Sequence, residues 1–88
     1  MGYSIKFSKE AQKTLKKIDK FQSKLIMNWI KNNLLNTNNP RQHGKGLSAN
    51  KAGFWRYRVG DYRIIADIED EELIILIVKV GHRREIYD

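Results

Sequence analysis

The sequence contains no cysteine, a single proline and no long apolar run. Without cysteine the chain can form neither a disulfide nor a thiolate site, and a reducing compartment is expected. The longest apolar run, residues 73–78, is far too short to span a bilayer, and the N-terminus lacks the basic-then-apolar pattern of a signal peptide. We therefore expect a cytoplasmic protein with no membrane segment.

Acidic residues are scarce in the first part of the chain. Residues 1–51 contain 11 Lys and Arg against two acids, whereas residues 52–88 contain 6 against 8. The whole chain has a formal net charge of +7, which favours a polyanion or an acidic protein as partner. The lysines of the first part can serve solubility alone. The arginines lie mostly in predicted strands, where a planar guanidinium suits bidentate binding of phosphate.

The length of 88 residues suits one small domain, so we expect residues 1–88 to form a single domain. Apolar–polar alternation predicts strands, and helical spacing with N-caps at Ser8 and Asp19 predicts two helices. The predicted fold is α+β, with the order β-α-α-β-β-β and a helical hairpin packed on one face of a small antiparallel sheet. The elements are a strand at 3–7, helices at 8–18 and from 19 to a turn at 36–40, and strands at 54–59, 62–69 and 72–80. The last strand is apolar on both faces and should be interior.

Residues 54–63 show the clearest functional pattern. Arg56 and Arg58 have one parity along the predicted strand, and Trp55 and Tyr57 have the other. Successive strand side chains point to opposite faces, so one face is aromatic and the other carries two guanidinium groups. We expect the aromatic face to pack in the core beneath the helices.

Gly60 and Asp61 suit a two-residue hairpin turn, which would place Arg58 nearly opposite Arg63. Like charges opposed across a strand pair are destabilising, so this pair favours a site for an anion. The alternative is that Arg63 turns to Asp61 or to the acid-rich residues 67–72.

The tail, residues 82–88, combines groups suited to RNA chemistry. His82 can transfer protons near neutral pH, and Tyr87 can stack on a base. The alternative is a solvated terminus, although Ile86 has the character of an anchor.

The connector at 41–53 is long for a compact domain, and such loops are usually functional or disordered. His43 within it is typical of a surface residue. His43 and His82 cannot make a metal site by themselves, and no Asp, Glu or Cys cluster has ligand spacing, so we predict no metal and no cofactor. Walker, dinucleotide and Ser-His-Asp signatures do not occur.

Together, residues 43–47 (HGKGL), 55–65 (WRYRVGDYRII) and 80–87 (VGHRREIY) resemble the RelE/ParE toxin superfamily, on the RelE side. The resemblance covers nearly the whole chain. It implies the RelE-like fold and a toxin of a type II toxin–antitoxin pair. It also implies an mRNA interferase that acts on mRNA in the ribosomal A site beside rRNA. The implied partner is a cognate RelB-like antitoxin, expected to offer an acidic segment, with operator DNA bound only through that antitoxin.

The resemblance also implies which residues act. The sequence departs from the best-known members by having arginine where they have lysine on the strand, and by a shorter spacing from Gly81 to Tyr87. Some members use histidine and glutamate for proton transfer, which makes His82 and Glu85 candidate acid–base groups. Carried over by motif, the catalytic set is Arg58, Arg63, Arg83 and Tyr87, with Arg56 and Lys45 as phosphate- or RNA-binding residues.

The implied reaction is a metal-independent endoribonuclease step, in which a ribose 2′-hydroxyl attacks the adjacent phosphorus and leaves a 2′,3′-cyclic phosphate. Two alternatives stay open. The first is a ParE-like inhibitor of DNA gyrase without nuclease activity, because one fold can carry both functions. The second is a bare RNA-binding module.

Overall fold

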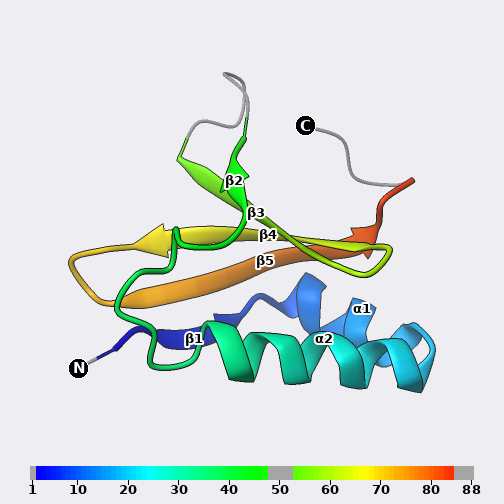
Figure 1. Cartoon of the computed structure of the whole chain (residues 1–88). Helices are drawn as coiled ribbons and strands as arrows, with labels where there is room; N and C mark the ends of the chain where they lie inside the picture. Colours follow the sequence, from blue (N-terminus) through cyan, green and yellow to red (C-terminus); the bar gives the residue numbers. More distant parts are fainter. Residues whose placement is uncertain (1, 48–52, 85–88) are drawn as a thin grey trace.

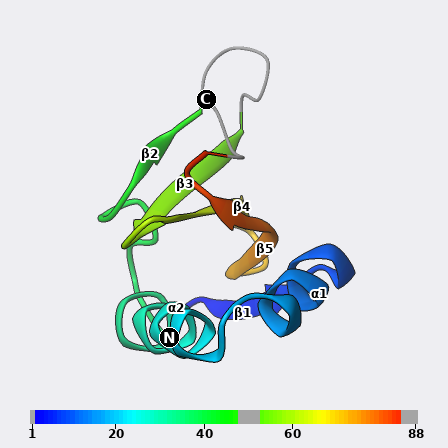
Figure 2. The same cartoon turned by 90° about the vertical axis from the view of Figure 1, so that its right-hand side faces the viewer.

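The computed structural model describes residues 2–47 and 53–84. Among the described residues, two helices cover one face of a five-stranded sheet and no helix covers the other (Figure 1). A view from the end shows the sheet twisting from β1, beside the helices, to β2, far from them (Figure 2). The strand order is β1-β5-β4-β3-β2. The elements are β1 (Ser4–Phe7), α1 (Lys9–Lys17), α2 (Lys20–Asn33), β2 (Lys45–Gly46), β3 (Phe54–Val59), β4 (Tyr62–Glu69) and β5 (Ile74–His82).

Both helices begin where the sequence predicts. The Ser8 side chain accepts a hydrogen bond from the Ala11 amide, and the Asp19 carboxylate accepts from two amides at the start of α2. These side chains satisfy amide donors that have no partner within the helix. After α2, Asn36 adopts a φ of 63°, a conformation that asparagine tolerates, and the chain turns away. No helix in the described part is long and apolar enough to cross a membrane.

Three details of the predicted fold are wrong. The order omits β2, because a two-residue strand is too short to show any periodicity. The sheet is not wholly antiparallel, since β1 pairs parallel with β5. The last strand occupies Ile74–His82 in place of 72–80, because Leu73 has a φ of 56° and ends the preceding turn. β5 is interior to the sheet, as predicted, between β1 and β4.

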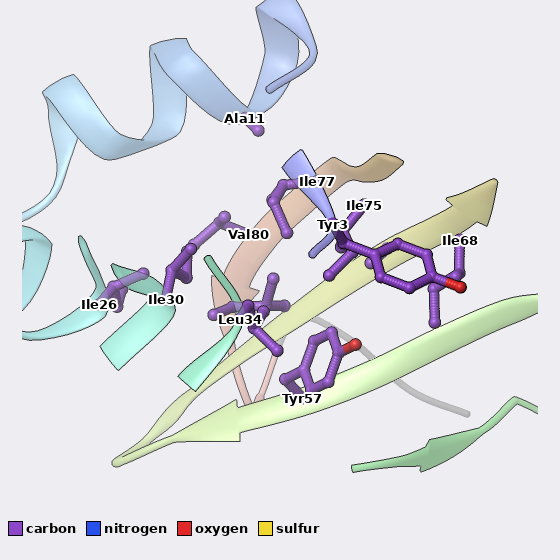
Figure 3. Close-up of a cluster of buried hydrophobic side chains, with 12 residues drawn as sticks. Tyr3, Ala11, Ile26, Ile30, Leu34, Tyr57, Ile68, Ile75, Ile77 and Val80 are labelled. Carbon is purple, nitrogen blue, oxygen red and sulfur yellow. The ribbon is translucent and has the colours of Figure 1, made fainter. Parts of the chain in front are cut away.

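The core lies between the helices and the sheet (Figure 3). Ile26 and Ile30 of α2 and Leu34 at its C-cap recur at helical spacing and are at most 2 % exposed. They face the inner side of the sheet, where Ile77 and Tyr57 are fully buried. The prediction that Tyr57 packs beneath the helices is therefore confirmed.

Trp55 packs against the same core but is only half-buried. Its indole Nε1 donates a 2.6 Å hydrogen bond to the His43 carbonyl oxygen. Gly46 lies opposite Trp55 in the β2–β3 pair. The residues that cover Trp55 therefore come from the connector after α2, which the sequence pattern could not assign to the sheet.

Tyr57→Phe is expected to destabilise the protein by about 1–3 kcal/mol, because the buried Tyr57 hydroxyl donates to the Pro40 carbonyl oxygen. Burial raises the pKa of Tyr57, so the hydroxyl stays protonated and donates across the accessible pH range. Urea denaturation measures the loss. Tyr62→Phe, at a half-buried tyrosine of the neighbouring strand, is the control. Equal stability of Tyr57→Phe and wild type would contradict the bond's contribution.

Candidate functional site: a basic sheet face and an edge cleft

The sheet face opposite the helices, here called the outer face, carries two arginines directly across from each other. Arg58 of β3 pairs in register with Arg63 of β4, as the predicted hairpin at Gly60 requires. Residues paired directly across strands share a face and have Cβ atoms about 4.5–5.5 Å apart. Arg58 is exposed and Arg63 is half-buried. The fold therefore places two cationic side chains opposite each other on one sheet face, which concentrates positive charge there.

Arg83 lies at the end of the hairpin that carries this arginine pair. Its backbone amide donates to the Asp61 carbonyl oxygen at 2.8 Å, which continues the strand contact beyond β5. Its guanidinium Nε is 3.9 Å from an Asp61 carboxylate oxygen. Both side chains are well exposed, so this ion pair is weak and Arg83 is able to meet a ligand. Arg83 lies two residues after Gly81, which pairs with Arg63. Arg83 therefore has the strand parity of the outer face.

The acids of residues 67–72 lie at the other end of the sheet. Asp67, the first of them along β4, is four residues from Arg63, about 13 Å at the usual rise of a strand. This spacing disfavours the alternative in which Arg63 turns to the acid-rich turn. The outer face is thus polarised, with cations at one end and carboxylates at the other.

Lys45 and Arg56 extend the basic surface across the sheet. They pair in register between β2 and β3, and Arg56 in turn pairs with Ile65 of β4. Ile65 pairs with Lys79 of β5. Ile65 is only 7 % exposed, as expected if the aliphatic stems of its cationic neighbours cover it. Lys79 was not predicted as part of this surface, because in the sequence it is only a single charge within an apolar strand.

The two acid–base candidates are placed differently. His82 pairs with Tyr62, which precedes Arg63 on β4. Because neighbouring strand residues point to opposite faces, His82 and Arg63 belong to opposite faces of the sheet. The His82 and Tyr62 rings form an edge contact at 5.6 Å, and His82 Nδ1 accepts from the Arg84 amide at 3.2 Å. His82 thus lies at the strand end, turned from the outer face. The predictions for Glu85 and Tyr87 fall outside the described residues.

A cleft of about 490 Å³ opens along the edge of β3. β2 pairs only with Trp55 and Arg56 of that strand, so the edge beyond them lines the opening. His43, expected at the surface, is half-buried here with its ring 5.7 Å from that of Trp29 in an edge-to-face contact. The lining is Trp29, His43, Gly44, Lys45, Arg56 and Arg58. Within residues 2–47 and 53–84, no three His, Asp or Glu side chains gather as a metal site requires.

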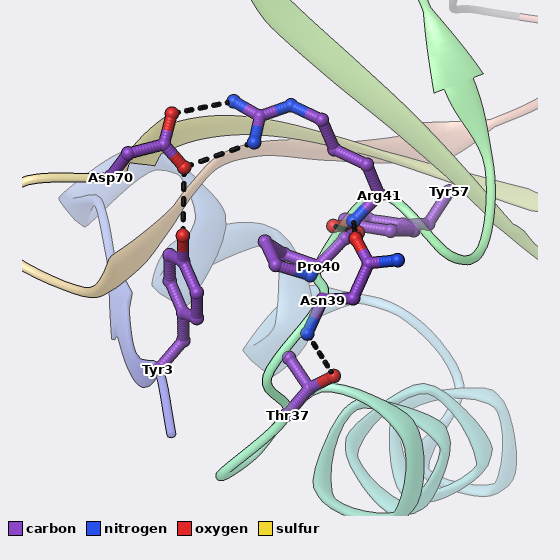
Figure 4. Close-up of polar contacts among 7 residues, drawn as sticks. All are labelled: Tyr3, Thr37, Asn39, Pro40, Arg41, Tyr57 and Asp70. Carbon is purple, nitrogen blue, oxygen red and sulfur yellow. Dashed lines mark hydrogen bonds and ion pairs between the residues drawn. The ribbon is translucent and has the colours of Figure 1, made fainter. Parts of the chain in front are cut away.

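The segment that supplies His43 and Lys45 is held in place by a polar network (Figure 4). Arg41 donates two hydrogen bonds to the Asp70 carboxylate, at 2.9 and 3.0 Å, and the Tyr3 hydroxyl donates to the same carboxylate at 2.7 Å. Together with the Trp55–His43 hydrogen bond, these contacts tie the connector to both the sheet and the N-terminal strand. The cleft wall is therefore positioned by residues distant in sequence.

Asp70→Asn is expected to flatten the acid side of the stability profile. The Arg41 guanidinium and the Tyr3 hydroxyl hold the pKa of Asp70 below its usual range. A lowered folded-state pKa contributes stability above the unfolded-state value, and this contribution is lost as the pH falls below about 4. The melting temperature of wild type should therefore fall more steeply below that pH than that of Asp70→Asn. Glu71→Gln, in the same turn, is the control, and parallel profiles for wild type and Asp70→Asn would refute the assignment.

Comparison with known proteins identifies the family and the fold of this chain. Residues 5–87 match the family described as ParE toxin of type II toxin–antitoxin system, parDE. The chain is 30 % identical over 87 residues to toxin RelG of Mycobacterium tuberculosis, covering 99 % of this chain and 98 % of that protein. It superposes on the toxin–antitoxin complex RelBE2 of the same organism with a TM-score of 0.84, 28 % identity, and coverage of 94 % and 93 % of the two chains.

A more distant relative shows the same fold. The archaeal RelE–RelB complex from Pyrococcus horikoshii matches with a TM-score of 0.71 and 25 % identity, over 98 % of this chain and 100 % of that one. The RelE-like α+β fold implied by the sequence is confirmed by these structures. The chain therefore belongs to the RelE/ParE superfamily of toxins from type II toxin–antitoxin systems.

Proposed function

We propose that this chain is a ribosome-dependent mRNA endoribonuclease that blocks translation by cutting mRNA in the A site. The observation that carries the proposal is the Arg58–Arg63 pair, two arginines directly opposite each other in register, with Arg83 at the end of the same hairpin. Neighbouring guanidinium groups suit a phosphate, because each can donate two hydrogen bonds to its oxygens. Similarity to RelE-type toxins gives independent support.

The reaction proposed is attack of a ribose 2′-oxygen on the adjacent phosphorus. The new 2′-O–P bond forms as the P–5′-O bond breaks, the 2′-hydroxyl proton passes to a base, and the leaving 5′-oxygen gains a proton. Arg58 and Arg63 stabilise the charge on the phosphoryl oxygens, which preorganised cations do without reorganisation. Arg83 neutralises the leaving oxygen, and Tyr87 orients a base. The step needs no metal, because the arginines supply the positive charge.

The reaction also needs a general base. Arginine keeps its proton far above neutral pH, so it is a poor base there. His82 is turned from the outer face, so it reaches the substrate only if the strand end moves, and Glu85 is the other candidate. We propose that orientation and charge stabilisation account for most of the rate, with the ribosome holding the mRNA in geometry suited to attack. Free RNA should then be cut poorly.

A cognate RelB-like antitoxin is the proposed regulator. Several relatives were solved as toxin–antitoxin complexes, including RelBE2 and the archaeal RelE–RelB pair. The net charge of +7 favours an acidic antitoxin segment, whose carboxylates would compete with phosphate for the outer face. We also place the protein in the cytoplasm, where its proposed substrate is found.

Primer extension on an mRNA under translation tests the proposal. Purified protein added to a translating extract should produce discrete cuts that require ribosomes, and the same mRNA without ribosomes should stay largely intact. Inhibition of DNA supercoiling without any cut would instead support the ParE-like gyrase inhibitor. Binding of RNA with neither cut nor supercoiling inhibition would support a bare RNA-binding module.

A further inference from the structure

The edge cleft has two chemically different walls. Lys45, Arg56 and Arg58 supply three cations, whereas Trp29 and His43 supply two aromatic rings. Its volume of about 490 Å³ falls within the ~300–1,000 Å³ of small-molecule sites. We propose that the cleft is a subsite for one unpaired RNA nucleotide, with the base against the rings and the phosphate on the cations. This assignment rests on the proposed function for its class of ligand.

The aromatic wall is built as a corner. The planes of Trp29 and His43 meet at 70°, and Trp29 is itself held by Tyr57, whose ring lies 5.6 Å away at 51°. A corner of two rings can take a flat base against one ring while the other contacts its edge. Base–aromatic stacking accepts any base, because every base has a π-face. The imidazole adds a polar atom that can favour one base edge over another.

The cationic wall links the cleft to the arginine pair. Arg58 belongs to both, since it lines the cleft and pairs with Arg63. Arg56 lies two residues away on the same strand face, about 6.6 Å at the usual rise. An RNA strand whose scissile phosphate lies on the arginine pair can therefore place the neighbouring nucleotide in the cleft, because the cationic surface is continuous between the two places. Trp29 and His43 would then influence which base flanks the cut.

An acidic protein segment is the competing ligand, because carboxylates also bind Lys and Arg. Such a segment would need the cations alone, and it would leave the paired rings of Trp29 and His43 unused. Single-stranded RNA uses both walls, since it alternates phosphates with flat bases. The lining therefore favours RNA.

An NMR titration of the ¹⁵N-labelled full chain tests the subsite directly and detects weak binding. The probes are a single-stranded hexaribonucleotide and the same ribose-phosphate backbone without bases. Wild type should bind the base-containing probe about tenfold more tightly, with shifts at the Trp29 indole. Trp29→Leu and His43→Ala should bind both probes with equal affinity. Phe21→Ala, at a 66 % exposed aromatic of α2, should behave as wild type.

Equal affinity of wild type for the two probes, including no binding of either, would overturn the assignment. So would retention of the difference in both Trp29→Leu and His43→Ala, or shifts in the cleft caused by a polyglutamate peptide but not by RNA. His43→Ala keeps the test valid if Trp29→Leu fails to fold. Primer extension distinguishes this failure from that of the proposed function. If the protein cuts mRNA but binds both probes with equal affinity, only the subsite is refuted. A chain that discriminates the probes but never cuts refutes the nuclease alone.

Discussion

Arg58→Gln is expected to reduce cleavage of ribosome-bound mRNA by about 100-fold, the usual effect of removing one preorganised donor from a charged transition state. The substitution keeps a long polar side chain but removes the charge and the bidentate fork. Because Arg58 is exposed and lies directly across from Arg63, its removal should also relieve repulsion. The variant should therefore melt at the same temperature as wild type or higher, although its activity is lost. Primer extension and thermal denaturation measure the two effects.

The matched control is Arg84→Gln, which removes an exposed arginine close to Arg83 but outside the arginine pair. It should cut mRNA at nearly the wild-type rate. The opposite pattern, with Arg58→Gln active and Arg84→Gln inactive, would move the site from the sheet to the tail. A melting temperature that falls in Arg58→Gln would show that Arg58 stabilises the folded chain and would contradict net repulsion between the two arginines.

Gly44→Ala is expected to destabilise the protein by about 2–4 kcal/mol and to disrupt the cleft. Gly44 has a φ of +77°, and a Cβ built there would lie 2.1 Å from the Arg56 carbonyl oxygen and 2.9 Å from the Trp55 indole nitrogen. No rotamer change relieves a clash with backbone, so the connector must move away from β3. That movement breaks the Trp55–His43 hydrogen bond and displaces the neighbouring Lys45.

Gly53→Ala separates the two causes of this loss. Gly53 also has a positive φ, +93°, but apart from its chain neighbours no atom of the described residues lies within 4 Å of a Cβ built there. It should cost only the backbone strain of about 1–2 kcal/mol. Urea denaturation compares the variants, and the RNA titration reports on the cleft. Equal losses in Gly44→Ala and Gly53→Ala would mean that the connector shifts at little cost and does not position the cleft.

The helices and the β3–β4 hairpin were predictable because their signals are local. Ser8 and Asp19 cap the helices through bonds to residues two or three positions ahead. The turn at Gly60 sets the register of Arg58 and Arg63 within six residues of chain. The arginine pair is thus a feature that a short stretch of sequence specifies.

The cleft could not be predicted, because its walls come from segments with no local signal. Trp29 reads as one more apolar residue of α2, and His43 as a loop histidine. They meet only because the connector returns along β3 and is tied there by Arg41 to Asp70, 29 residues further on. Leu73 likewise shifted β5 by a backbone conformation that its apolar side chain does not indicate.

The sequence by itself determined the two helices, the β3–β4 hairpin, the basic charge and the opposed arginines, since periodicity, caps and a two-residue turn act over a few residues. The tertiary structure alone decided which face His82 occupies, that Lys79 joins the basic surface, and that two aromatic rings lie beside Lys45, Arg56 and Arg58. These outcomes depend on strand register and long-range hydrogen bonds, whose partners are far apart in the chain.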